Sequence, residues 1–332
     1  MLVGVVAACV ATPALQGPLP VRNQHPAQLT VQHMDPASAH VLPAGSAAAR
    51  LDSAYTSLFL SGTDGSNQFR MDGEYLRVAP RMRVGLGANF EFGLELPVAH
   101  TSGGWIDSFV IGYHDTLGLP DQNRQTVAND RFGVTALQNG VDVWSVDRAP
   151  LELLDVPLQL TYQILPPGEG RLGATLRGGI ELPTGDSARG YGSGGIDGTV
   201  GAVLDYRALG MGWYGHAQHT FSGTPSRSRG TGFHFSDVTS IGFAAELPLA
   251  TDLHAFAQFE WETSTLRELH LDAVARDQIL LWLGGRLQVG SGAAIELALA
   301  EDLVWRISPD FTLWLGLVWS PGSSATPPPS YP

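Results

Sequence analysis

Apolar residues recur at every second position along much of the chain, which is the period of a β-strand whose two faces meet different surroundings. In FEFGLELPVAH, residues 90–100, apolar side chains occupy the even positions, whereas Glu91 and Glu95 occupy odd positions. A packed globular core would leave these carboxylates without water. The tripeptide ELP returns at Glu181 and Glu246, so an apolar face opposite a face that carries acids is a recurring feature of the chain.

This alternation predicts twelve antiparallel strands, an even number, most of them about ten residues long. A change of phase between Tyr75 and Met82, near Pro80, predicts a bulge or a break in the second strand. The predicted strands are 47–61, 68–85, 88–101, 152–165, 171–184, 195–208, 211–222, 233–249, 252–266, 277–289, 292–303 and 309–319.

Short links and longer loops largely alternate between these strands, as the periplasmic turns and external loops of bacterial outer-membrane barrels do. Links such as Leu209 to Gly210 are followed by loops such as 223–232. In a barrel the apolar face meets lipid and the other face meets a hydrated lumen, so no charge lies in hydrocarbon. The pattern therefore favours an all-β fold, a single transmembrane β-barrel at 47–320.

Composition separates this barrel from a soluble β-sandwich. Only 15% of the residues are charged although 44% are hydrophobic, whereas a sandwich needs charged surfaces on both sheets. No stretch approaches the roughly 18 to 20 uninterrupted apolar residues of a membrane helix. The net charge of -13 argues against nucleic acid as a partner. We expect the outer membrane of a Gram-negative cell as the location, with outer-membrane lipid and the barrel-assembly machinery as partners.

The ends of the chain have a different composition from the strands. Residues 1–16 are apolar and small, which is typical of a secretory signal peptide, although a basic first region is missing. Cys9 lies in VAAC, so a lipoprotein signal is the alternative. Residues 17–46 are predicted as an N-terminal periplasmic extension, and residues 321–332 as a tail rich in Pro and Ser.

The polar face of the strands would line the lumen with charges of both signs. Such a lining is either a selectivity or gating surface, or a mesh of salt bridges that fills a modest barrel. The predicted lining residues are Arg81, Arg83, Glu91, Glu95, Asp155, Arg177, Glu181, Asp205, Glu246, Glu260 and Glu262.

The segment after the third strand breaks the strand period. Its apolar residues follow helical spacing, which predicts a short amphipathic helix that acts as a plug or lid, or as an external cap on the loops. The residues of this predicted lid helix are Trp105, Ile106, Phe109, Tyr113, His114 and Asp115.

No residue pattern indicates an enzyme, a metal site or a cofactor. His114 and Asp115 lack convergent partners, and the spacing of His216 and His219 places them on opposite faces of a strand. The GxSxG, HExxH, P-loop and CxxC motifs are absent. We therefore predict no catalytic, metal or cofactor-binding residues.

Three features carry a resemblance to a known family: GPLPVRNQHP at 17–26, SGGWIDSFVIGYHDTLGLPDQNR at 102–124, and the ELP strand ends. With them the chain resembles the DUF3187 proteins, a proteobacterial group of uncharacterised function regarded as outer-membrane barrels, from about residue 17 to 320. The resemblance implies a location and an architecture but no activity. The chain departs from usual barrels by continuing past Trp319 into SPGSSATPPPSYP.

Three functions follow as hypotheses. The first is a porin-like channel or passive transporter for an unknown small solute, with the lid helix controlling access. The second is a closed structural or partner-binding outer-membrane barrel. The third is an envelope enzyme that modifies lipid.

Overall fold

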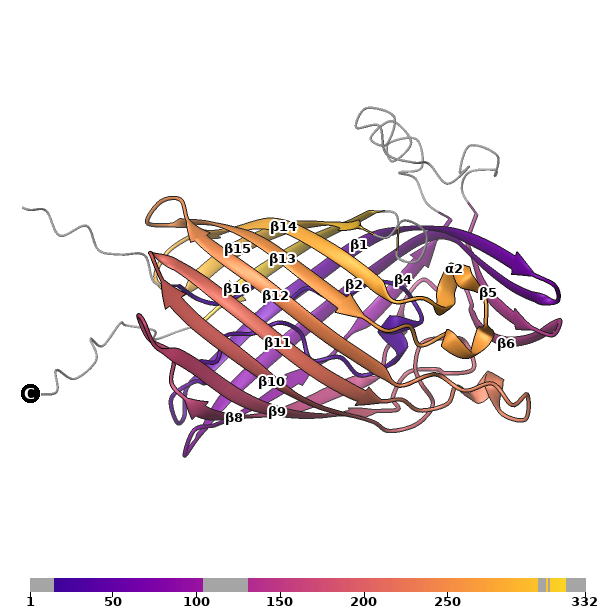
Figure 1. The fold of residues 1–332 in the computed structure, drawn as a ribbon, viewed down its shortest axis with the longest axis horizontal. Coiled ribbons are helices and arrows are strands. Elements are labelled where there is room, and N and C mark those ends of the chain that lie inside the picture. Colours follow the sequence, from indigo (N-terminus) through magenta and orange to yellow (C-terminus); the bar gives the residue numbers. More distant parts are fainter. Residues whose placement is uncertain (1–14, 104–130, 304–308, 310, 321–332) are drawn as a thin grey trace, which may run out of the picture.

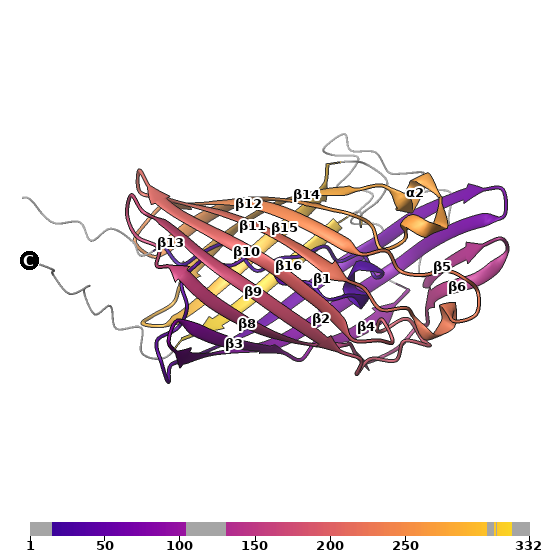
Figure 2. The same cartoon turned by 60° about the horizontal axis from the view of Figure 1, so that its bottom comes forward.

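Twelve wall strands close into an antiparallel barrel, as the sequence predicts (Figures 1 and 2). The computed structural model describes residues 15–103, 131–303, 309 and 311–320. The barrel closes because the first strand pairs with both the second and the last. The wall strands are β1 (Ala47–Asp64), β2 (Asn67–Gly87), β3 (Phe90–Glu95) continued by β4 (Val98–Ser102), β8 (Val156–Leu165), β9 (Leu172–Leu182), β10 (Asp197–Ala208), β11 (Met211–Phe221), β12 (Val238–Pro248), β13 (Leu253–Glu262), β14 (Gln278–Gln288), β15 (Ala293–Asp302) and β16 (Phe311–Trp319).

The irregular part of the wall is not where the sequence predicts it. β2 runs through Pro80 without a change of phase, and its pairing with β3 shifts register only between Gly85 and Gly87. The predicted break near Pro80 is therefore wrong. The break lies in the neighbouring strand at Leu96 and Pro97, because proline has no N–H to donate to the ladder. The N–H of Leu96 still donates to the Pro80 carbonyl at 3.0 Å.

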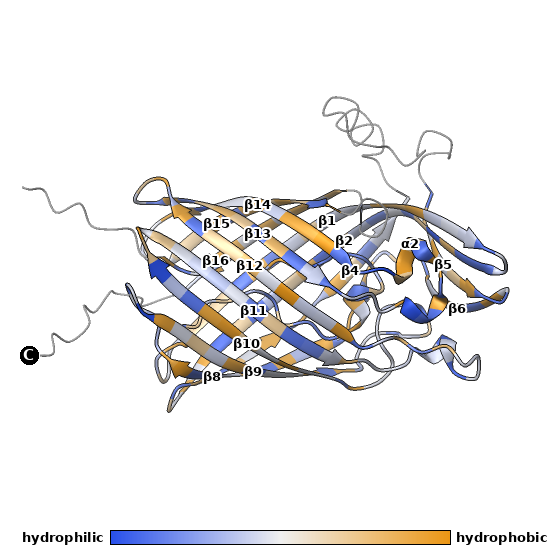
Figure 3. Cartoon of the chain, in the orientation of Figure 1, coloured by the Kyte–Doolittle hydropathy of each residue, from blue (hydrophilic) through white to orange (hydrophobic). Residues whose placement is uncertain are grey.

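The two faces of the wall have opposite character, and hydrophobic and hydrophilic residues both recur along the wall strands (Figure 3). Outward side chains are apolar and exposed; Leu176 of β9, for example, is 53% exposed. Inward neighbours on the same strand, such as Thr175 and Glu181, are buried. An apolar exterior of this kind suits hydrocarbon, whereas water would penalise it.

Additional strands and short helices lie at the end with the longer loops, called here the loop end. β5 (Gly133–Gln138) pairs with β2, β6 (Val141–Val146) pairs with β5, and β7 (Glu152–Leu153) pairs with β4. The loops contain η3 (Ser226–Ser228), η4 (Arg267–Leu269) and α2 (Asp272–Ala275). None of the helices in the described ranges combines the length and apolarity needed to cross a bilayer. The predicted lid helix falls at residues 104–130, outside the described part of the chain.

An apolar cluster closes the loop end. It is built from the tips of β1 and β2, from β5 and β6, and from the loops, and its largest buried side chains include Phe69, Trp144, Tyr191 and Phe233. Ala27, Leu29 and Val31, which precede the barrel in sequence, belong to the same cluster. The opposite end, which carries the short links, is called here the short-turn end.

Candidate functional site: the barrel lumen

Residues 17–43, called here the N-terminal segment, form a loop inside the barrel (Figure 1). The N–H of Gly17 donates to Oε2 of Glu246 at 3.1 Å near the short-turn end. The segment then rises to the short helix η1 (Gln28–Thr30), where Nε2 of Gln28 donates to the Thr263 carbonyl at 3.1 Å. It returns to the short-turn end, where the Leu42 N–H donates to Glu91 at 2.9 Å.

This course differs from the predicted extension at 17–46. Most side chains between Pro18 and Ala39 are buried by the barrel, so the segment fills the lumen and does not lie apart from the wall. Which compartment its ends face stays a prediction. This course was hard to predict from the sequence, because the segment has neither strand nor helix periodicity along most of its length.

Wall side chains supply the hydrogen bonds that a neighbouring strand would otherwise supply to this irregular backbone. The amide of Gln258 accepts from the Leu19 N–H at 2.7 Å and donates to the Leu19 carbonyl at 3.0 Å. Oε1 of Gln218 accepts from the Met34 N–H at 3.0 Å. Because buried backbone groups need partners, these amides allow a segment without regular structure to occupy the lumen.

Buried ion pairs join the segment to the wall in the half of the lumen near the short-turn end. Arg81 contacts Asp35 of the segment, and its Nε lies 3.0 Å from Asp52 and 2.7 Å from Glu95. Arg50 extends the network, with Nη2 2.7 Å from both Asp52 and Glu296. A multiply paired guanidinium is the arrangement in which buried charges are tolerated. Burial opposes the charge of Asp35, but Arg81 and other nearby cations hold the pKa of Asp35 below its usual value.

A cavity of about 640 Å³, called here the vestibule, lies between the segment and the wall at the short-turn end. Arg177 reaches into it and donates to the Asp35 carbonyl at 2.7 Å and to Gln159 at 2.9 Å. Its guanidinium makes no ion pair with a carboxylate within the described residues. The charged lining consists of the arginines Arg50, Arg81, Arg83, Arg177, Arg207 and Arg286 and the carboxylates Asp35, Glu91, Glu95 and Glu296.

Carboxylates without arginine partners lie in the half of the lumen near the loop end. Glu181 and Asp197 lie directly opposite each other on the paired strands β9 and β10. Asp155, in the link before β8, accepts from the N–H groups of Gly185 at 2.7 Å and Ser193 at 2.8 Å. Burial raises the pKa of Asp155 to about 6 against these hydrogen bonds. Among the described residues, none of these three acids forms an ion pair with an arginine.

The predicted lining residues lie where the alternation places them. The ten in wall strands face the lumen, and Asp155 lies at its loop-end rim. Their role in selectivity or gating stays a prediction. The predicted lid residues lie outside the described residues. Most of the lining residues that the prediction left out lie an even number of positions from a buried residue on the same strand, so the alternation rule would have found them. These residues are Arg50, Asp52, Arg77, Asp197, Arg286 and Glu296.

A family model and several solved structures match the chain. A family described as "Protein of unknown function (DUF3187)" matches residues 1–320. No curated protein matches the chain. The fold is similar to the COG4313 outer membrane channel from Pseudomonas putida F1, with a TM-score of 0.53 and 13% identity over 87% of this chain and 100% of that one.

Two other solved barrels are more distant. The KdgM porin aligns with a TM-score of 0.42 and 8% identity over 82% of this chain and 98% of its own. The P. putida toluene transporter TodX aligns with a TM-score of 0.36 and 11% identity over 84% of this chain and 90% of its own. At such identities only the barrel architecture is shared. The likeness in fold is greatest, of the three, for the COG4313 channel.

Proposed function

The chain belongs to the DUF3187 family, and from this membership and the geometry of its lumen we propose that it is an outer-membrane channel for a small solute, closed by its own N-terminal segment. The observation that carries the proposal is a polar lumen with an open vestibule, blocked by a segment that is not part of the wall. The apolar exterior supports the membrane location. The likeness to an outer membrane channel supports the same class of fold.

The segment can act as a gate because it is held by side-chain contacts and not by strand pairing. Its hydrogen bonds to Gln218, Gln258 and Glu246 can be replaced by water when it leaves. Both ends of the segment lie at the short-turn end, so it can withdraw through that end without crossing the apolar cluster. Opening also requires a rearrangement at the loop end, where Ala27, Leu29 and Val31 pack into that cluster.

The test holds the segment in place and then releases it. In a Cys9→Ser background, Asn23→Cys and Gln278→Cys replace side chains that hydrogen-bond to each other near the bend. A short, cleavable bifunctional thiol reagent joins them. We expect planar-bilayer conductance to fall on cross-linking and to return on reduction. Deletion of residues 17–43 should give a larger and permanent conductance.

The matched control is Asn23→Cys with Ile279→Cys. Residue 279 is adjacent to Gln278 but lies on the outward face of β14, so the reagent should not join the pair and conductance should stay unchanged. A deletion variant that folds and is as silent as the cross-linked chain would contradict a channel.

That outcome would favour a closed structural barrel, the second candidate. The observation in its favour is that buried ion pairs tie the segment to the wall in one half of the lumen, while the apolar cluster packs at the loop end. The predicted helix lid is a separate proposal, and deleting residues 103–120 tests it by the same conductance measurement.

A further inference from the structure

Two buried carboxylates of β13, Glu260 and Glu262, contact no arginine among the described residues. The carboxylates of the short-turn half differ, since each contacts an arginine, as Glu95 contacts Arg81. Burying two carboxylates side by side without a cation is costly. The pair therefore needs a proton or a positive charge from another source.

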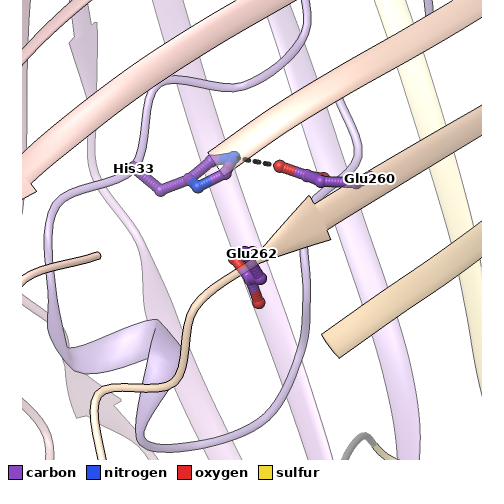
Figure 4. Close-up of side chains that lie close together, drawn as sticks. All are labelled: His33, Glu260 and Glu262. Carbon is purple, nitrogen blue, oxygen red and sulfur yellow. Dashed lines mark ion pairs between the residues drawn. The ribbon is translucent and has the colours of Figure 1, made fainter. Parts of the chain in front are cut away.

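Two histidine rings lie close to Glu260, and Figure 4 shows one of them, His33, beside the pair. Nε2 of His33, in the N-terminal segment, lies 3.1 Å from Oε1 of Glu260. Nε2 of His216, on the inward face of β11, lies 3.6 Å from the same oxygen. Ligand atoms of His33, Glu260 and Glu262 all lie within 4.8 Å of one another. Two ligands of a tetrahedral ion, each bonded at about 2.0 to 2.1 Å, are about 3.4 Å apart, so these separations suit a shared ion.

Several of the atoms that converge here have no hydrogen-bond partner in the described part of the chain. Neither carboxylate oxygen of Glu260 has a hydrogen-bond partner of acceptable geometry within the described residues, and Nε2 of His216 has none. Their side chains are only 2% and 8% exposed. Buried polar atoms almost always have partners, so close approach without hydrogen-bond alignment indicates that something else joins them.

We propose that His33, His216 and Glu260, with Glu262 beside them, bind a divalent cation of the zinc class. Imidazole nitrogens favour Zn²⁺ and its neighbours in the first transition row, whereas Ca²⁺ and Mg²⁺ take oxygen ligands. The ion would tie the N-terminal segment to the wall, because His33 belongs to the segment and the other ligands belong to strands.

Binding at His33 requires one tautomer of its ring. Nε2 of Gln218 lies 3.0 Å from Nδ1 of His33. A neutral imidazole that binds an ion through Nε2 keeps its proton on Nδ1, so the contact between His33 and Gln218 must rearrange when an ion binds.

Calorimetry on the purified, folded full-length chain tests the site. After treatment with a chelator, we expect one Zn²⁺ per chain, binding at least about 10-fold tighter than Ca²⁺. His216→Asn and Glu260→Gln should each weaken binding by about 10-fold or more.

The control is His219→Asn, on the same strand but on the outward face, where His219 pairs with Asp237. It should leave Zn²⁺ binding unchanged. The site is overturned if the chain binds no Zn²⁺, if it binds Ca²⁺ equally well, or if both ligand variants bind like the unaltered chain while running as folded barrels on unheated gels. These readouts measure binding alone, so they do not depend on whether the barrel conducts.

Discussion

At the scale of single residues, the three ELP glutamates show what alternation determines. Glu95, Glu181 and Glu246 all face the lumen and are buried. Their partners differ, because each is set by the neighbouring strands and by the N-terminal segment. Glu246, for example, accepts from Tyr214 at 2.6 Å and lies 2.6 Å from Nδ1 of His254. The tripeptide thus predicts the direction of the side chain, but not the charge that it meets.

Arg81 should be one of the residues most important for stability. Its side chain is 11% exposed and contacts Asp35, Asp52 and Glu95, so Arg81→Gln would leave three buried carboxylates without their shared cation. We expect a loss of about 3 to 5 kcal/mol in the free energy of unfolding, measured by urea in lipid vesicles. Arg276→Gln, at a pair whose arginine is 63% exposed, should cost at most about 0.5 kcal/mol. Equal losses would contradict the proposed network.

His25 should make the N-terminal segment sensitive to acid. Burial lowers its pKa to about 3 from the ordinary value of 6.5, while the ring stacks on Phe69 and Nδ1 accepts from the Ala27 N–H. A released segment binds the proton more readily, so the stabilisation is complete above about pH 6.5 and declines as the pH falls towards 3. The free energy of unfolding should therefore decrease between pH 7.5 and 4.5.

The variant His25→Asn should flatten this pH dependence, because asparagine keeps an acceptor near Nδ1 and does not titrate. Some dependence should remain, since burial, with Arg83 nearby, also lowers the pKa of His40. The depressed pKa of Asp35 matters only in stronger acid, below the ordinary range of a carboxyl. An unchanged pH profile in the variant would rule out His25 as the sensor.

At the scale of elements, all twelve predicted strands are present, and most ends agree within a few residues. The period-two pattern sufficed because each wall strand has an exposed apolar face and a buried face that carries polar side chains. The position of the break was missed because Pro80 and Pro97 each lack an N–H and look alike in the sequence. Only the strand pairing shows at which proline the strand is interrupted. The insertion of the N-terminal segment could not be predicted, since it depends on amides such as Gln258 that meet it only in the closed barrel.

Gly85 of β2 supports the returning limb of the segment. A side chain there would overlap the carbonyl groups of Leu42 and Pro43, which lie against the strand. We expect Gly85→Val to displace this limb and raise the conductance in planar bilayers. Gly178→Val is the control, because a side chain at that outward position meets no atom within 4 Å. A folded Gly85→Val barrel with unaltered conductance would show that the limb does not obstruct the path.

At the scale of the whole molecule, the apolar exterior predicts that the cost of an outward-facing charge depends on its depth in the bilayer. Leu176 lies in the middle of β9 and is 53% exposed, whereas Leu209 lies in a short turn and is 92% exposed. Leu176→Arg should cost about 2 to 4 kcal/mol of unfolding free energy in a bilayer, and Leu209→Arg about 0 to 1. Folding titrations in vesicles measure both. Similar costs at the two depths would argue against a membrane around this wall.

The distribution of charge along the barrel has an electrical consequence. Arginines line the vestibule and most of them pair with carboxylates, while acids such as Glu181 and Asp197 lie towards the loop end without an arginine partner among the described residues. A conduit with nearly balanced charge at one mouth and uncompensated negative charge at the other rectifies the ionic current. Once the segment is removed, current should be greater with the loop-end bath positive, because ions of both signs then accumulate inside. Replacing Arg83 and Arg177 by Gln should make the current–voltage curve more nearly symmetric.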